Sequence, residues 1–76
     1  MTGTIKLPWT WRRVRAAALA AGLDVRKDAN GCTVISRGKR GPSVVRWPDR
    51  TIMRADVELS LCTAMRPCDV ARLFGL

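Results

Sequence analysis

The chain has 76 residues, of which 47% are hydrophobic and 26% are charged, with 14 lysines and arginines against six acidic residues. This length accommodates one small domain, residues 1–76, and the hydrophobic fraction excludes a disordered tail. A domain of this size buries only about 60% of the surface of its unfolded chain, so we expect marginal stability and keep a homodimer open as an alternative.

The first predicted element is a helix over residues 11–21, after a lead-in that contains Pro8. Thr10 can cap this helix by accepting a backbone N–H, and Gly22 is suited to end it. Arg15 interrupts the apolar face, so its aliphatic stem must lie along the apolar surface. The residues that share this face are Trp11, Val14, Ala18 and Ala21.

Short strands are predicted after this helix, over residues 24–28, 32–37, 43–47 and 51–54. Asn30-Gly31 between the first two is a strong hairpin signal, because both residues tolerate a positive φ. The segment Gly38 to Pro42 predicts a loop in which two cations stand between glycines, and Pro48 to Arg50 predicts a turn.

The C-terminal third predicts one or two further helices. Asp56 can cap a helix that contains Val57, Leu61 and Met65, although a loop is an alternative for this segment. Pro67 suits the first turn of a second helix, Asp69 suits the positive end of its dipole, and Gly75 suits its end.

Together these elements predict an α+β fold. It consists of an N-terminal helix, a three- to four-stranded antiparallel β meander, and one or two C-terminal helices packed on one sheet face. The other face of the sheet is then expected to be exposed and cationic.

The positive charge is concentrated in one part of the chain. Residues 1–54 hold 12 basic and three acidic side chains, whereas residues 55–76 hold two basic and three acidic ones. Eleven of the 14 basic residues are arginines, whose planar guanidinium binds phosphate or carboxylate in a bidentate manner. This bias predicts contact with DNA or RNA. A merely soluble basic surface and an acidic protein partner are the alternatives.

The loop Gly38-Lys39-Arg40-Gly41 is the sharpest local feature, because glycines let the backbone approach a phosphate and two cations at a hairpin tip can enter a groove. A solvated turn is the plain alternative. Trp11 is expected in the core. Trp9 and Trp47 are either core residues or platforms for unpaired bases. The candidate nucleic-acid or partner-binding residues are Arg12, Arg13, Arg37, Lys39, Arg40, Arg46, Arg50, Arg54 and Trp47.

Nothing in the sequence favours catalysis. Histidine is absent, which removes the usual nucleophile pairs and the commonest metal ligand. Cys32, Cys62 and Cys68 lack the spacing of a zinc site or a disulfide framework, so we expect buried free thiols and no metal or cofactor. Asp56-x-Glu58 is too sparse for a magnesium nuclease site, and helix capping by Asp56 is the simpler interpretation. We therefore expect a protein that is not an enzyme.

The expected location is cytoplasmic. The sequence has no apolar stretch approaching the roughly 18 residues of a membrane helix, so no membrane partner is expected. Arg12-Arg13 before the alanine-rich run is similar to a twin-arginine export signal, but Arg15 interrupts the run.

Two resemblances bear on function. Residues 65–76, with the string Asp69-Val70-Ala71-Arg72-Leu73, resemble the opening helix of a helix-turn-helix; the sequence stops at Leu76, before a recognition helix, so no base readout is implied. The order helix, strands, helix also resembles double-stranded-RNA-binding-like folds, including the small HicA-type ribonuclease toxins. Those toxins use a histidine on the second strand, where this chain has Cys32-Thr33, so their activity is not implied.

The sequence thus favours a small non-enzymatic regulator that binds nucleic acid through phosphates. The alternative is a protein-interaction inhibitor or adaptor, for example a phage-encoded one directed at a host defence or transcription complex. Trp9, Trp47 or the C-terminal helix would then anchor the partner. A third idea, a toxin-like or antitoxin-like partner protein, rests on the resemblance in fold alone.

Overall fold

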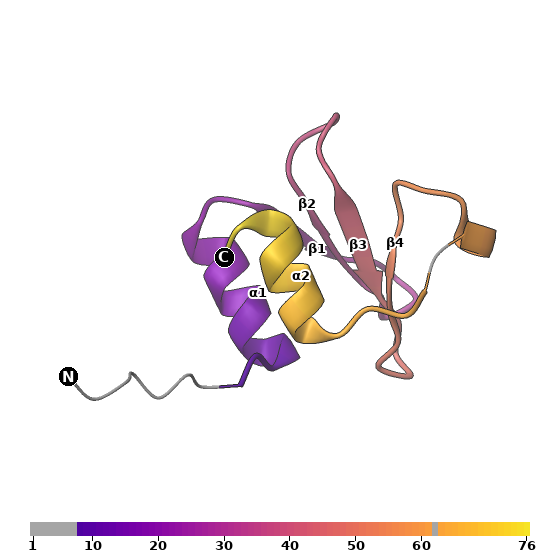
Figure 1. Cartoon of the computed structure of the whole chain (residues 1–76), viewed down its shortest axis with the longest axis horizontal. Coiled ribbons are helices and arrows are strands. Elements are labelled where there is room, and N and C mark those ends of the chain that lie inside the picture. The colour runs from indigo at the N-terminus through magenta and orange to yellow at the C-terminus, as the bar shows by residue number, and fades with distance from the viewer. Residues whose placement is uncertain (1–7, 62) are drawn as a thin grey trace.

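The computed structural model describes residues 8–61 and 63–76. Four strands form one antiparallel meander in the order β1-β2-β3-β4, and helices α1 and α2 lie beside each other on one side of it (Figure 1). This arrangement confirms the predicted α+β fold. The elements are α1 (Trp11–Ala20), β1 (Asp24–Lys27), β2 (Thr33–Ser36), β3 (Ser43–Arg46), β4 (Ile52–Arg54), the 3-10 turn η1 (Leu59–Leu61) and α2 (Pro67–Phe74).

Helix α1 begins and ends close to where the sequence predicts. The Thr10 hydroxyl accepts the Arg13 backbone N–H at 3.2 Å, and Gly22 follows the helix with a φ of 80°. Val14 and Ala18 are fully buried, whereas Leu19 lies off the apolar stripe and is 54% exposed. Ala21, which was predicted to be helical and on the stripe, is the exposed C-cap residue.

The core lies between the two helices and the sheet. Alternation along the strands turns Ile35, Val44 and Ile52 toward the helices, and α2 presents Phe74 to the same core. The Arg37 guanidinium donates to the Phe74 carbonyl oxygen, which joins the end of β2 to the end of α2. Among the described residues, the buried cluster consists of Val14, Ala18, Ile35, Val44, Ile52, Val70, Ala71 and Phe74.

The expected cationic outer face of the sheet is not formed. Cross-strand pairing places Val34, Val45 and Met53 side by side on the face opposite the helices. Arg26 shares this face, but its guanidinium is paired with Asp24 at 3.0 Å. The prediction was wrong because the sequence does not show which valine of the pair Val44-Val45 faces the core. Val44 does, so Arg46, two residues further along β3, and Arg54, the partner of Val44 on β4, lie on the helix side.

Of the two alternatives for the segment after Asp56, the described residues form the loop, with the short 3-10 turn η1, and not the helix. The Asp56 carboxylate, expected as a helix cap, accepts instead from Arg54 Nε at 3.1 Å and from the Ser43 backbone N–H at 3.4 Å. The Met65 N–H donates to the Ile52 carbonyl at 2.7 Å, which holds the returning chain along β4. These contacts favour an extended path over a helix.

Helix α2 confirms its predicted signals. Pro67 occupies its first turn, and the Asp69 carboxylate accepts the backbone N–H of Arg66 at 2.9 Å. Gly75 ends the helix in the left-handed region with a φ of 69°. The helix buries Val70 and Phe74, so the segment that resembles the first helix of a helix-turn-helix serves here as a core helix.

The contact of Arg54 with Asp56 predicts a pH-dependent stability. Hydrogen bonds from the Arg54 side chain lower the pKa of Asp56 to about 2, below the roughly 3.9 of an unfolded chain. The contact therefore stabilises the fold above about pH 4 and is lost as the pH falls through 2. Both side chains are partly exposed to solvent, so we expect a contribution of about 1 kcal/mol.

Urea unfolding of wild type and Asp56→Asn checks this. The variant should be less stable by about 1 kcal/mol at pH 6 and equal to wild type near pH 2. A difference that persists unchanged at pH 2 would exclude the ion pair as its cause.

Candidate nucleic-acid interface

Most acidic side chains are already engaged by their own neighbours. Asp56 and Asp69 pair with Arg54 and Arg66, as Asp24 does with Arg26. Asp28 accepts backbone N–H groups of the β1–β2 turn, and Asp49 accepts the Thr51 N–H of the β3–β4 turn. The side-chain hydrogen bonds from Arg66 lower the pKa of Asp69, and the Thr51 N–H lowers that of Asp49. Three of these carboxylates therefore pair with arginines, and the other two accept backbone N–H groups within turns.

One group of cations lies around a hollow between α1 and the first two strands. The hollow has a volume of about 250 Å³. Arg46 stands beside it, with its guanidinium carbon 5.4 Å from the centre of the Trp11 ring. We call this site, Arg46 included, the cationic hollow. Its lining residues are Trp11, Arg12, Arg15, Lys27 and Thr33.

The strand register explains why the cationic hollow forms. Lys27 pairs with Thr33, and Thr33 pairs with Arg46, so these three side chains form one row on the helix side of the sheet. The next row, which contains Ile35 and Val44, lies in the hydrophobic core. The polar row therefore continues the core-facing surface next to α1, where Arg12 and Arg15 face it from positions three residues apart.

The loop between β2 and β3 holds a second group of cations. Lys39 and Arg40 are exposed at its tip, as the sequence predicts. This loop lies at the end of the sheet opposite the β3–β4 turn (Figure 1). Arg37 at the base of the loop is exposed, but its guanidinium bonds the last carbonyl of α2. The loop is therefore a site separate from the cationic hollow.

The remaining predicted residues do not join one surface. Trp47 is 41% exposed where β3 ends, and Arg50 is exposed in the following turn with a φ of 75°. Arg54 is bonded to Asp56, and the Arg13 guanidinium carbon lies 4.3 Å from the centre of the Trp9 ring. Of the nine predicted residues, only Arg12 and Arg46 belong to the cationic hollow.

Arg15, Lys27 and Trp11 also contribute to this site, although none of them was predicted to bind nucleic acid or a partner. A signal for Arg15 was present, because it interrupts the apolar face of a helix. Lys27 follows the core-facing Val25 by two residues, so alternation alone places it on the helix side. Trp11 and Trp9 are half-buried and pack against the core, which agrees with the core interpretation for Trp11.

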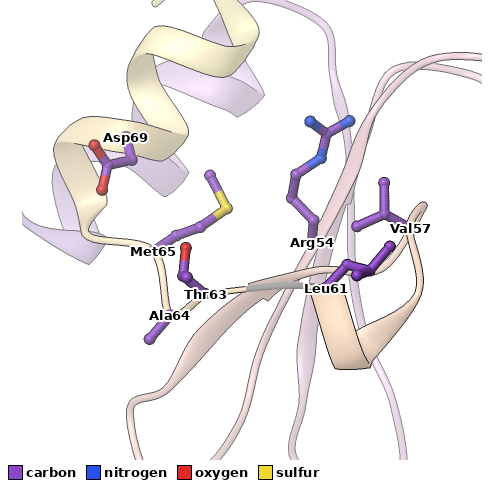
Figure 2. Close-up of a pocket in the computed structure, with 7 residues that line it drawn as sticks. All are labelled: Arg54, Val57, Leu61, Thr63, Ala64, Met65 and Asp69. Atoms are coloured by element: carbon purple, nitrogen blue, oxygen red, sulfur yellow. The ribbon is translucent and has the colours of Figure 1, made fainter.

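A second hollow of about 560 Å³ lies between β4, the segment after it and the start of α2 (Figure 2). Its two charged residues, Arg54 on β4 and Asp69 on α2, lie on opposite sides of it and have ion-pair partners of their own. Val57 and Leu61 form its outer wall, and Leu61 is 77% exposed. Its chemistry is therefore mostly apolar, unlike that of the cationic hollow.

The other groups that could carry chemistry are clusters of metal ligands and the cysteine thiols. Within residues 8–61 and 63–76, no three histidine, cysteine or acidic side chains lie close enough to hold a metal ion. Cys32 is a buried free thiol, and burial, together with Asp28 and Asp49, raises its pKa, which makes it a poor nucleophile. Cys68 is a half-buried free thiol, and Cys62 lies outside the described residues.

No helix in the described part of the chain is long and apolar enough to cross a membrane. Comparison of the chain with protein-family models, with curated proteins and with solved structures finds no match in any of the three. The function must therefore be argued from the surface of the molecule itself.

Proposed function

We propose that the protein is a small non-enzymatic regulator that binds nucleic acid through backbone phosphates. The observation that supports this most is the cationic hollow, in which cations from α1, β1 and β3 converge around Trp11 and Thr33. Among the described residues that line it, none carries a carboxylate. Such an arrangement has the charge and the hydrogen-bond donors that a phosphodiester requires.

The clustering of cations in the cationic hollow favours nucleic-acid binding over a basic surface that only keeps the protein soluble. Like charges held near one another repel and destabilise the folded state, so a solvated surface gains nothing by gathering them. Arg12, Arg15 and Lys27 come together from a helix and a strand, although the chain has acidic residues that could have separated them. A bound polyanion removes this repulsion, and its attraction to the clustered cations contributes to the free energy of binding.

The test is fluorescence anisotropy of labelled duplex DNA, single-stranded DNA and RNA over a series of salt concentrations. We expect micromolar or tighter binding that weakens steeply with salt, by about 0.9 log units per log unit of salt for each phosphate neutralised on a duplex. Lys39→Ala/Arg40→Ala reports separately on the β2–β3 loop. Absence of binding to all three nucleic acids at low salt would refute the proposal.

The second hollow favours one alternative, a protein-interaction inhibitor or adaptor. Val57 and Leu61 present exposed apolar surface beside it, which is the chemistry of a protein contact rather than of a phosphate site. Val70, Ala71 and Phe74 of the C-terminal helix are buried in the core, which favours Leu61 over this helix as the anchor for such a partner. A protein interface should fail when Leu61 alone is truncated, whereas phosphate binding should weaken gradually as single cations are removed.

A further inference from the structure

The cations of the cationic hollow are grouped closely enough to form one defined phosphate site on the charged surface. This inference rests on the proposed function. The β2–β3 loop presents Lys39 and Arg40 on an exposed tip, where each cation is free to meet a different phosphate. Arg12, Arg15 and Lys27 are exposed as well, but they line one open hollow of about 250 Å³ from a helix and a strand. Cations that share one small volume are suited to share one anion.

The other walls of the cationic hollow complete this site. Thr33 on β2 is only 9% exposed and lines the hollow, and its hydroxyl is a donor that can bond a phosphate oxygen. The Trp11 ring forms an apolar wall, and the Arg46 guanidinium over it is held at the edge of the hollow by a cation–π contact. A donor that is already ordered loses less side-chain entropy when the ligand binds.

We propose that the cationic hollow seats a single backbone phosphate of the nucleic acid, with Arg15 and Lys27 as its shared cationic ligands. Thr33 can donate to the same phosphate, whereas Arg12 and Arg46 stand at the rim of the hollow, where they can meet adjacent phosphates. This phosphate fixes the position of the nucleic acid on the protein, while the exposed cations of the β2–β3 loop add contacts that depend less on geometry.

A double variant tests whether the two cations share one phosphate. Arg15→Gln/Lys27→Gln should weaken duplex binding about tenfold or more and lower the salt slope by about 0.9, the value for one phosphate lost. If the two cations contact separate phosphates, the slope should instead fall by about 1.8. A fall of 1.8, or no change of slope at all, would overturn the proposal of a shared phosphate.

The matched control removes two positive charges away from the cationic hollow. In Arg26→Gln/Arg72→Gln, one residue lies on the opposite face of β1 and the other is exposed on α2. Its salt slope should equal that of wild type, and its affinity should fall no more than two- to threefold through the change in net charge. If the control loses as much binding as the hollow variant, net charge alone explains the effect and the site is refuted.

Thermal unfolding separates loss of the site from loss of the fold. Removing two neighbouring like charges should leave the melting temperature of Arg15→Gln/Lys27→Gln unchanged or raise it. Failure of wild type to bind any nucleic acid would refute the proposed function itself. Normal binding by both wild type and the hollow variant would refute only this inference.

Discussion

Replacing Phe74 with alanine is expected to lower the free energy of unfolding by about 3–5 kcal/mol. Phe74 is the largest fully buried side chain and packs among residues of both helices and of the sheet. A domain of this length typically has a total stability of about 4–11 kcal/mol, so the variant should lose from about a quarter to all of it. Urea unfolding followed by circular dichroism measures the loss.

Arg72→Ala is the control for this prediction, because Arg72 lies on the same helix and is exposed. It should change the stability by less than about 0.5 kcal/mol. If Phe74→Ala loses under about 1 kcal/mol, α2 is not packed on the sheet as described, and the core assignment is contradicted.

The second large effect is expected at Gly41, where a side chain has no room. A Cβ atom at this position would lie 2.1 Å from the Arg37 carbonyl oxygen and 2.9 Å from the Arg37 Cβ. Both are far inside van der Waals contact, and the closer atom belongs to the backbone. Gly41→Ala must therefore move the β2–β3 loop and disturb the bond from the Arg37 N–H to the Pro42 carbonyl. We expect a loss of about 2–3 kcal/mol, measured by urea unfolding.

Gly38→Ala in the same loop provides the comparison. Gly38 has a φ of 69°, but a Cβ there would meet nothing within 4 Å, so the cost is that of the left-handed backbone alone, about 1–2 kcal/mol. An equal or smaller loss in Gly41→Ala would show that the loop is more open than the structure indicates.

Local signals predicted most of the fold. Thr10, Asn30-Gly31, Pro67 and Gly75 each act within a few residues, and each stands in the structure where its chemistry places it. Asp56 shows the limit of this reasoning. Aspartate is a preferred helix cap, but the fold brings Arg54 and the Ser43 N–H to the Asp56 carboxylate. The local sequence around Asp56 cannot show that the Ser43 N–H from β3 competes with a helix N-terminus for this carboxylate.

The site was less predictable than the fold. The sequence identified a basic chain but assigned the cations to the outer face of the sheet, since Val44 and Val45 are equally plausible core residues. Once Val44 is known to be buried, Arg46 must lie on the helix side. Arg15 and Lys27 belong to different elements, and only the packing of α1 against β1 brings them into one hollow.

The most direct measurement of the central claim is a titration of isotope-labelled protein with a short DNA duplex or RNA, followed by amide and indole N–H signals in two-dimensional NMR. The chain has three tryptophans, and the structure places only Trp11 in the wall of the cationic hollow. We predict that the signals of the Trp11 indole N–H and of the Lys27 and Thr33 amides shift as nucleic acid is added. These shifts should saturate at the same nucleic-acid concentration as the binding measured by fluorescence anisotropy. Shifts confined to the β2–β3 loop or to the region of Leu61, with Trp11 unchanged, would contradict the phosphate site in the cationic hollow.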